Sequence, residues 1–496
     1  MRDRFRILKD VAAYSASGVL GQVLGLVSGG VVAKLLGPTE FGMWNAVSLA
    51  LVYGAYFDLG ILPAMAREVP TYRGQGKLGE AKEIEGTAFT TTFLAAVLVA
   101  VILLAVSFRA GQPGSIVFGL RGMAVVIILQ RSYVYYLTIL RCYNEFGLLS
   151  KLQVIFAAVS AALAVLMVLW FGFEGRVAAA VAAQLLALTY VGSIWRLDRF
   201  FSFSFPVAAQ LVKAGMPLII ASIVMGLVTT IDRLIIVTYL GPTELGYFGA
   251  SLLITGVVFL IPGTVGEVLY PRLTHRFGEA GRDLQALKNY VLVPTVLLGY
   301  LVPVLIGPIY LALPAVIELL LPQYVPGVAA GRIVAIGMFF FSLERVASYF
   351  LVTIGKLKQF VLLACLVLAL NIVLDLVFLA MGMGIEGVAL GGTAITYLCY
   401  AVATVGYALS HYTRRREDWV RFFAKLLLPF VYMVMLLITI ERFVLGGLTD
   451  GTFVALMALG IRVGLFLLGC LPLVYAASRE VKMSSLSATL ATWRER

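Results

Sequence analysis

Fourteen apolar stretches, each close to the length of about 20 residues that a helix needs to cross a bilayer, take up most of this chain. They lie near 11–33, 43–65, 87–107, 115–140, 150–171, 176–195, 214–239, 247–270, 290–311, 328–354, 360–380, 385–408, 422–440 and 451–476. Only 13% of the residues are charged, whereas a soluble domain carries about 25%. The sequence therefore predicts an all-α polytopic protein of the cell (inner or plasma) membrane with about 14 transmembrane helices.

The Lys and Arg residues fall mostly on one side of these predicted helices. With a cytoplasmic N-terminus, 28 of the 38 lie in cytoplasmic segments, four in outer segments and six within spans. Because basic connections stay in the cytoplasm, we expect both termini to be cytoplasmic. The same bias accounts for the net charge of +12, so the charge gives no reason to expect a nucleic-acid partner.

An internal repeat organises the chain. The heptapeptide Leu36–Gly42 returns as Leu240–Gly246, with six of seven residues identical and a shift of 204 positions. Its Gly-Pro pair cannot continue a helix, so each copy is predicted to be a tight turn between two spans. The segment around Arg131 recurs around Arg345, a shift of 214.

These shifts predict two six-helix lobes in the same orientation, related by an axis along the membrane normal. We expect an N-terminal lobe over 1–200 and a C-terminal lobe over 201–412. Two additional helices in 413–477 and a basic cytoplasmic tail in 478–496 stand outside the repeat.

Arginines within the predicted spans are the main candidates for a binding site. Burying an ionised side chain there costs about 2.5–3.5 kcal/mol, so it normally faces a cavity or a partner. A cationic cavity would suit phosphate, which the planar guanidinium can hold through two oxygens. The alternative is pairing within the membrane, for instance with Glu344, or snorkelling of Arg121 and Arg332 toward the outer surface. The candidates are Arg131, Arg345, Arg121, Arg332 and Arg233.

Carboxylates and tyrosines complete the list of candidates. Asp58, Asp232 and Asp375 lie within spans, where each could bind a coupling cation or proton or could neutralise a cavity arginine. Four tyrosines closely follow the two repeat-related arginines and could stack on sugar rings, although Tyr also collects at membrane interfaces. They are Tyr133, Tyr135, Tyr136 and Tyr349.

The sequence contains no catalytic motif that we can identify. It has no Walker-type loop, H-E-x-x-H or G-x-S-x-G pattern, and no large soluble region. The two histidines lie in charged loops, which argues against a metal site. We therefore expect a transporter and not an enzyme, without cofactors and driven by a Na⁺ or H⁺ gradient.

The N-terminal pattern Gly21-Gln22 with Val32–Gly42, and the later Asp232–Ile235 running into Gly241–Tyr247, resemble a known family. These are the Wzx-type polysaccharide biosynthesis flippases of the multidrug/oligosaccharidyl-lipid/polysaccharide exporter (MOP) superfamily. The resemblance covers roughly residues 10–410. It implies a two-lobed cleft with alternating access that moves an undecaprenyl-pyrophosphate-linked oligosaccharide from the inner to the outer leaflet. It also implies membrane lipids and other polysaccharide-assembly proteins as partners.

Three other functions are open. Fourteen helices match the lipid II flippase branch, but that branch tends to place cavity arginines on its first two helices, where this chain has Asp58. A multidrug or cation antiporter of the same superfamily should have a carboxylate-rich, arginine-poor cavity. A non-transporting scaffold or polymerase-like component of an assembly complex is the alternative from another class, although a polymerase should carry a large outer loop.

Overall fold

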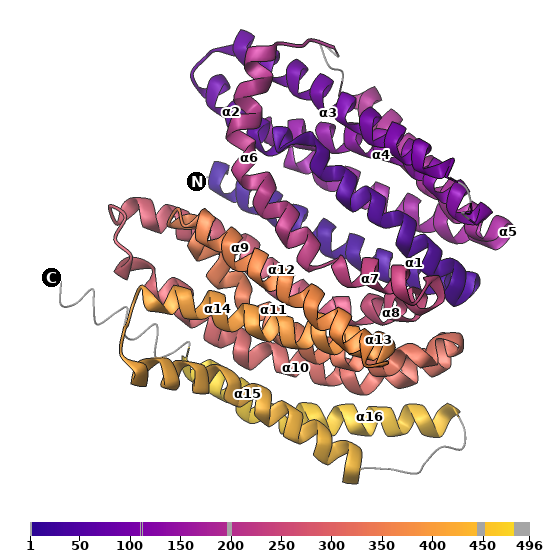
Figure 1. The fold of residues 1–496 in the computed structure, drawn as a ribbon. Helices are drawn as coiled ribbons and strands as arrows, with labels where there is room; N and C mark the ends of the chain where they lie inside the picture. The colour runs from indigo at the N-terminus through magenta and orange to yellow at the C-terminus, as the bar shows by residue number, and fades with distance from the viewer. Residues whose placement is uncertain (1, 110, 112, 196–200, 444–451, 481–496) are drawn as a thin grey trace. The chain divides into compact units, whose positions relative to one another are not determined.

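The computed structural model describes residues 2–109, 111, 113–195, 201–443 and 452–480 (Figure 1). Within these ranges the chain is helical and forms no strand. In the described part of the chain, eleven helices are long and apolar enough to cross a membrane. The chain divides into two compact units, Met1–Gly249 and Ala250–Arg496. The all-α membrane fold predicted from the sequence is confirmed at this level.

The first unit contains the longest helices. Its elements are α1 (Arg2–Gly54), the 3₁₀ turn η1 (Ala55–Asp58), α2 (Ile61–Gly74), α3 (Leu78–Ser107), α4 (Gly114–Cys142), α5 (Phe146–Ile194), α6 (Phe205–Val228), α7 (Ile231–Tyr239) and the start of α8 (Pro242–Thr255). Helix α5 packs along α1 and α4, and α3 packs against α4 and α2. Helix α6 also contacts α2, which ties residues after 200 to this unit. The compact units are defined by packing and not by repetition, so the predicted lobe boundary at 200–201 stays a prediction.

Two kinks divide the longest helices. Gly37 in α1 has φ 73° and ψ 172°, and Gly172 in α5 has φ 56° and ψ −133°. A residue with a side chain rarely adopts such positive φ values, so glycine permits the change of direction. Helix α1 thus covers the first predicted span and the first part of the second, which continues through η1 into α2. Helix α5 covers the fifth and sixth.

The second unit follows with shorter elements. They are η2 (Gly256–Phe259), α9 (Leu260–Glu279), η3 (Gln285–Leu287), α10 (Lys288–Leu320), η4 (Pro322–Gly327), α11 (Val328–Thr353), α12 (Leu357–Ala380), α13 (Gly384–Val388), the π-helix η5 (Ala389–Ile395), α14 (Thr396–Ser410), α15 (Arg416–Phe443) and α16 (Thr452–Gly469). Helix α11 is enclosed by α10, α14, α9 and η5.

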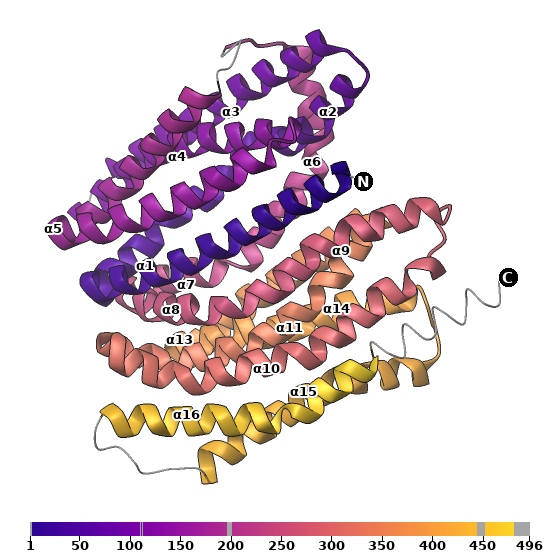
Figure 2. The same cartoon turned by 180° about the vertical axis from the view of Figure 1, so that it is seen from behind.

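The last two helices, α15 and α16, lie beside α10 in both ribbon views (Figures 1 and 2). Glycines on α10 permit this close approach. A Cβ added at Gly307 would lie 1.9 Å from the ring of Phe466, and one at Gly299 would lie 3.0 Å from Leu426. The helices outside the repeat are therefore seated on the second unit through small residues, as is common for membrane helices.

The two copies of the repeated turn contact each other within the first unit. A Cβ added to Gly42 would lie 1.7 Å from the carbonyl oxygen of Pro242. The reciprocal contact, from Gly246 to the carbonyl oxygen of Pro38, would measure 1.9 Å. Each glycine thus meets the repeat-equivalent proline of the other copy, which is the signature of a local two-fold relation.

Residues near that local axis meet their own repeat equivalents. The hydroxyl oxygens of Thr39 and Thr243 are 2.9 Å apart, and the side chain of Asn45 lies against Gly249. Both pairs are separated by the 204 positions of the repeat. The repeated heptapeptide therefore encodes a self-complementary contact as well as a turn.

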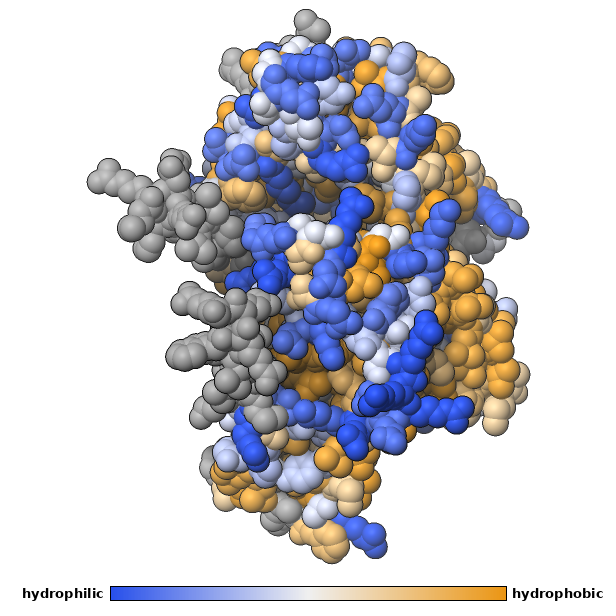
Figure 3. All heavy atoms as spheres, turned by 90° about the vertical axis from the view of Figure 1, so that its left-hand side faces the viewer, coloured by the Kyte–Doolittle hydropathy of each residue, from blue (hydrophilic) through white to orange (hydrophobic). Residues whose placement is uncertain are grey.

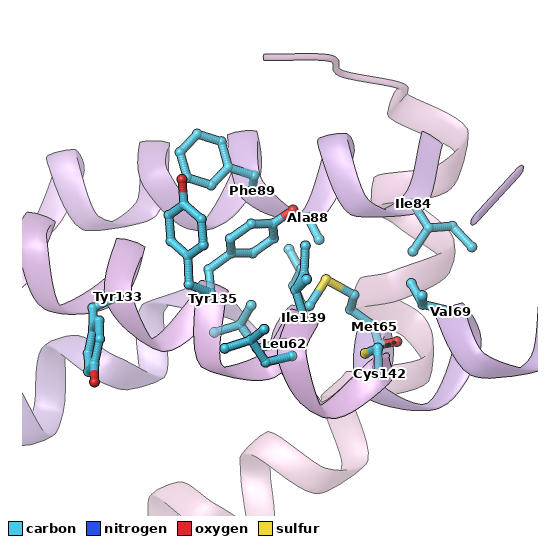
Figure 4. Close-up of a cluster of buried hydrophobic side chains, with 14 of the residues drawn as sticks. Leu62, Met65, Val69, Ile84, Ala88, Phe89, Tyr133, Tyr135, Ile139 and Cys142 are labelled. Carbon is cyan, nitrogen blue, oxygen red and sulfur yellow. Dashed lines mark hydrogen bonds between the residues drawn. The ribbon is translucent and has the colours of Figure 1, made fainter. Parts of the chain in front are cut away.

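Apolar packing follows the expected pattern for a bundle in lipid. In the first unit, α2, α3 and α4 enclose a buried cluster that includes Met65, Phe89 and Ile139 (Figure 4). Figure 3 shows hydrophilic side chains gathered at the helix ends that face the viewer and apolar side chains along the flanks. Such flanks are suited to contact with lipid tails.

Candidate functional site

A break between α1 and α2 sets a carboxylate inside the first unit. After η1, Leu59 and Gly60 take φ values of 53° and 79°. A Cβ at Gly60 would lie 2.6 Å from the carbonyl oxygen of Gly215, so a larger residue would not fit. The N–H of Gly60 donates to Oδ1 of Asp58 at 3.0 Å. Broken helices of this kind build ion and substrate sites in transporters.

Arg131 of α4 forms an ion pair with Asp58, 73 residues away in the sequence. The Arg131 side chain is 11% exposed and that of Asp58 is 4% exposed. Of the two roles predicted for Asp58, coupling-ion binding or neutralisation of a cavity arginine, the second describes this geometry. Removing one partner of a buried pair leaves an uncompensated charge, so this pair holds the break and α4 together.

Arg345 in α11 has a different environment. Its Nε lies 3.8 Å from Oε1 of the neighbouring Glu344, and its guanidinium lies over the ring of Phe341 at 5.0 Å. Glu344 is fully buried and accepts a hydrogen bond from Ser348. The predicted alternative of pairing with Glu344 describes this geometry. With a third of its side chain exposed, Arg345 keeps a guanidinium surface available to a ligand.

Arg332 and Arg121 differ in the groups that they contact. Arg332 donates to Glu441 of α15 at 2.6 Å and lies over the ring of Tyr310 at 4.7 Å. Arg332 and Tyr310 border a pocket of about 570 Å³ in the second unit, which Glu386 also lines. Arg121 is exposed, donates to the hydroxyl of Ser107 at 3.4 Å and lies over the ring of Phe108 at 5.0 Å.

The other predicted carboxylates do not gather with Asp58. Asp232 and Arg233 lie on α7, where Asp232 is buried and Arg233 is half-buried. Asp375 is fully buried on α12 in the second unit. No group of three His, Cys, Asp or Glu side chains that could hold a metal ion occurs in the described part of the chain.

The four tyrosines differ in what their rings face. Tyr135 and Tyr136 are 1% and 3% exposed and belong to the apolar cluster of the first unit (Figure 4). A sugar could reach neither ring without unpacking this cluster. Tyr133 is 4% exposed but also lines a polar pocket, and Tyr349 packs against Tyr270 with ring centroids 5.4 Å apart.

Sequence reasoning missed two sets of polar residues. Glu441 was not proposed as a partner of Arg332, because it lies outside the repeat. A single carboxylate at the end of a predicted span could have indicated it. The glutamines of α1, α4 and α5, which line the polar pocket, were also missed. Several glutamines in neighbouring apolar spans would have indicated them.

Known proteins share the fold of this chain and part of its sequence. The fold matches an inward-facing multidrug resistance MATE family transporter of the MOP superfamily, with a TM-score of 0.68 at 15% identity, covering 79% of this chain and 94% of that one. It also matches the lipid II flippase MurJ in an inward closed conformation, with a TM-score of 0.67 at 17% identity, covering 92% and 97%. A proposed O-antigen transporter of Shigella flexneri is 22% identical over 362 residues, covering 69% of this chain and 84% of the relative.

The eleven apolar helices and these likenesses define a multi-pass integral membrane protein of the cell membrane, with the fold of MOP-superfamily transporters. The family model for polysaccharide biosynthesis proteins matches residues 7–276. That range is more than half of the chain, and the protein belongs to this family. The family resemblance seen in the sequence is confirmed.

Proposed function

We propose that this protein is a flippase that moves an undecaprenyl-pyrophosphate-linked oligosaccharide from the inner to the outer leaflet. Membership of the polysaccharide biosynthesis family and the likeness to a proposed O-antigen transporter support this substrate class. The observation that carries the proposal is the buried pair of Arg131 and Asp58 at a broken helix. It provides a guanidinium whose partner can be exchanged. In this proposal the protein performs no catalysis.

The transport topology has fourteen crossings with both termini in the cytoplasm. The eleven apolar helices become thirteen when α1 and α5 are each divided at their kinks. The segment from α8 to α9, interrupted by η2, supplies the fourteenth. The excess of Lys and Arg in the segments assigned to the cytoplasm supports the orientation.

Exchange of the Arg131 partner links ion binding to substrate binding. In the pair, the charge of Arg131 is neutralised by Asp58. Protonation of Asp58, or binding of Na⁺ to its carboxylate, removes that neutralisation and leaves a buried cation. A pyrophosphate then becomes the better partner, because guanidinium binds two phosphate oxygens in parallel. An ion gradient would thus drive the substrate's movement without ATP.

Lipid II is the second candidate substrate. The likeness to the lipid II flippase covers 92% of this chain, more than the MATE likeness does. The same exchange at Arg131 would bind its pyrophosphate, so this alternative changes the glycan and not the chemistry of the site.

Transbilayer movement in proteoliposomes tests the proposal. Undecaprenyl-pyrophosphate bearing a short oligosaccharide is the substrate, with H⁺, Na⁺ or no gradient imposed. Asp58→Asn keeps the size of the side chain, and we expect it to move substrate at a rate that no longer responds to the gradient. Arg131→Gln should abolish movement, and the double variant, with no charge left unpaired, is the control for folding.

Three results would count against the proposal. Full gradient-driven movement by a folded Arg131→Gln variant would exclude the partner exchange. Gradient-driven movement by Asp58→Asn equal to that of the wild type would exclude Asp58 as the coupling group. Folded wild type that moves no lipid-linked saccharide would exclude the flippase function, and lipid II used in parallel distinguishes the two substrates.

A further inference from the structure

A polar pocket without charged residues lies inside the first unit. Helices α1, α4 and α5 line an open pocket of about 430 Å³, within the range of small-molecule sites. None of its described lining residues is an acid or a base, although the pocket sits within a membrane protein whose other polar sites are ion pairs. Its polar wall includes Gln22, Gln130, Gln153, Gln184, Ser17 and Ser28.

Glycines form much of the α1 side of this pocket and leave space beside the α1 backbone. A Cβ added at Gly18 or Gly25 would have no atom within 4 Å, and one at Gly21 would only touch Ala157 at 3.6 Å. These glycines are therefore not required for tight helix packing. They leave space into which a ligand could fit against the α1 backbone.

Two amides in the wall have unused hydrogen-bonding capacity. Gln184 is 8% exposed, and its Oε1 has no hydrogen-bond partner in the described part of the chain. Oε1 of Gln130 is likewise buried and has no hydrogen-bond partner in the described part of the chain. Gln153, in contrast, is oriented by the hydroxyl of Ser17, which donates to its Oε1 at 2.8 Å. Buried polar atoms are nearly always hydrogen-bonded, so the two unpartnered amides point to a ligand with polar groups of its own.

Aromatic rings form another part of the wall. The rings of Tyr133 and Phe156 have centroids 5.4 Å apart and are tilted by 35°. Tyr133 also belongs to the apolar cluster, but Figure 4 shows its ring pointing away from two other aromatic members, Phe89 and Tyr135. The pocket thus offers amide donors and acceptors together with aromatic surface.

This combination selects among ligand classes. A phosphate would require cations, and a metal or organic cation would require carboxylates, neither of which lines the described pocket. A lipid tail would leave the amides unpaired. A sugar ring satisfies both walls, because its hydroxyl or acetamido groups can bond the amides while its C–H face lies against the aromatic rings.

We propose that this pocket binds a sugar ring of the lipid-linked oligosaccharide, an inference that rests on the proposed function for the source of the sugar. Gln130 lines the pocket, and the next residue, Arg131, pairs with Asp58. Helix α4 therefore presents the glycan contact and the pyrophosphate ligand at successive positions, about 100° apart around its axis. Glycan and pyrophosphate can be recognised together by one helix.

Three variants test the pocket. Gln184→Met keeps the size of the side chain and removes the amide, and Gly25→Leu fills the cavity. Gly30→Leu is the matched control, because Gly30 lies on the same helix, has no atom within 4 Å of an added Cβ, and does not line the pocket. Since the Gln184 amide oxygen has no partner, Gln184→Met should unfold no more readily than the wild type, whereas a purely structural glutamine would lose stability.

The readouts are binding and transport. In lipid nanodiscs, saturation-transfer NMR measures contact with methyl glycosides of glucose, galactose, rhamnose and N-acetylglucosamine, with inorganic pyrophosphate as competitor. We expect a signal from at least one glycoside that pyrophosphate does not displace, reduced about five- to tenfold by Gln184→Met and by Gly25→Leu but not by Gly30→Leu. In proteoliposomes, the wild type should move undecaprenyl-pyrophosphate N-acetylglucosamine faster than undecaprenyl pyrophosphate, and both pocket variants should lose this preference.

The outcomes separate the two proposals. Transport by Gln184→Met and Gly25→Leu with unchanged sugar preference, together with glycoside signals equal to those of the wild type, would overturn the pocket and leave the flippase standing. Gln184-dependent glycoside binding in a protein that moves no lipid would uphold the pocket and assign it to free sugars. Displacement by pyrophosphate would overturn the assignment to a neutral ligand.

Discussion

Arg131 and Arg345 are equivalent in the repeat, yet they meet their carboxylates in different ways. Arg131 pairs with Asp58, which comes from a broken helix 73 residues away, and only 11% of its side chain is exposed. Arg345 lies 3.8 Å from its own neighbour, Glu344, and a third of its side chain is exposed. The cation is common to both halves, but its neutralisation is long-range in one half and local in the other.

The residues around each arginine explain this difference. Gln130 is the repeat equivalent of Glu344, so the first half has an amide where the second has an acid. A 3₁₀ turn interrupts the helices in both halves, as η1 (Ala55–Asp58) in the first and η2 (Gly256–Phe259) in the second. The first turn ends in Asp58, however, whereas η2 contains no acid. Each arginine therefore has an acid in a different place, and the first half has an amide where the second half has its acid.

The largest expected effect is on the free energy of unfolding when Arg131 is removed. Arg131→Ala leaves Asp58 as a buried, unpaired carboxylate, so we expect a loss of about 3–5 kcal/mol. Arg345→Ala should cost about 1–2 kcal/mol, because its contact with Glu344 is longer, at 3.8 Å, and a third of its side chain is exposed to solvent. Chemical denaturation in detergent, followed by helical circular dichroism, measures both. Equal losses would contradict the proposed difference between a long-range and a local pair.

The two repeated turns, unlike the two arginines, make equivalent contacts. Gly42→Ala and Gly246→Ala each place a Cβ within 2 Å of a backbone oxygen of the opposite turn. We expect each to destabilise the protein by about 3 kcal/mol, since backbone must move to relieve the overlap. Effects that are equal within error would confirm the local two-fold contact, and Gly30→Ala, which meets open space, should cost little. A large effect of only one variant would show that the contact is not reciprocal.

The sequence predicted the features that depend on repetition and hydropathy, including the all-α membrane fold and the turns at Gly37 and Gly241. It identified Asp58 and Arg131 separately but not as a pair, because their meeting depends on the break at Leu59 and Gly60. Hydropathy also could not tell which side of α4 faces the core. Three nearby tyrosines consequently received one role. All three pack in the apolar cluster, but Tyr133 also lines the polar pocket, which Tyr135 does not.

Introducing the acid of the second half at the equivalent position of the first half tests the comparison directly. Gln130→Glu gives the first half the local acid of the second half. In the Asp58→Ala background, where Arg131 has lost its partner, we expect it to restore about 1–2 kcal/mol of unfolding free energy. In the wild-type background it should restore nothing, because Arg131 is already neutralised. A double-mutant cycle on denaturation midpoints measures this coupling, and zero coupling would show that position 130 cannot reach Arg131.

The smallest effect is expected for the ion pair between Arg332 and Glu441. Their contact is short, at 2.6 Å, but their side chains are 29% and 32% exposed. Solvent therefore screens the pair, and truncating either residue should cost about 0–1 kcal/mol, much less than Arg131→Ala. Arg332→Gln, Glu441→Gln and the double variant form the cycle, with unfolding measured at low and high salt. A coupling of several kcal/mol that does not change with salt would show that burial in the membrane sets the strength of these pairs, and not the exposed fraction of their side chains. In that case the contrast between Arg131 and Arg345 would have to be attributed to distance alone.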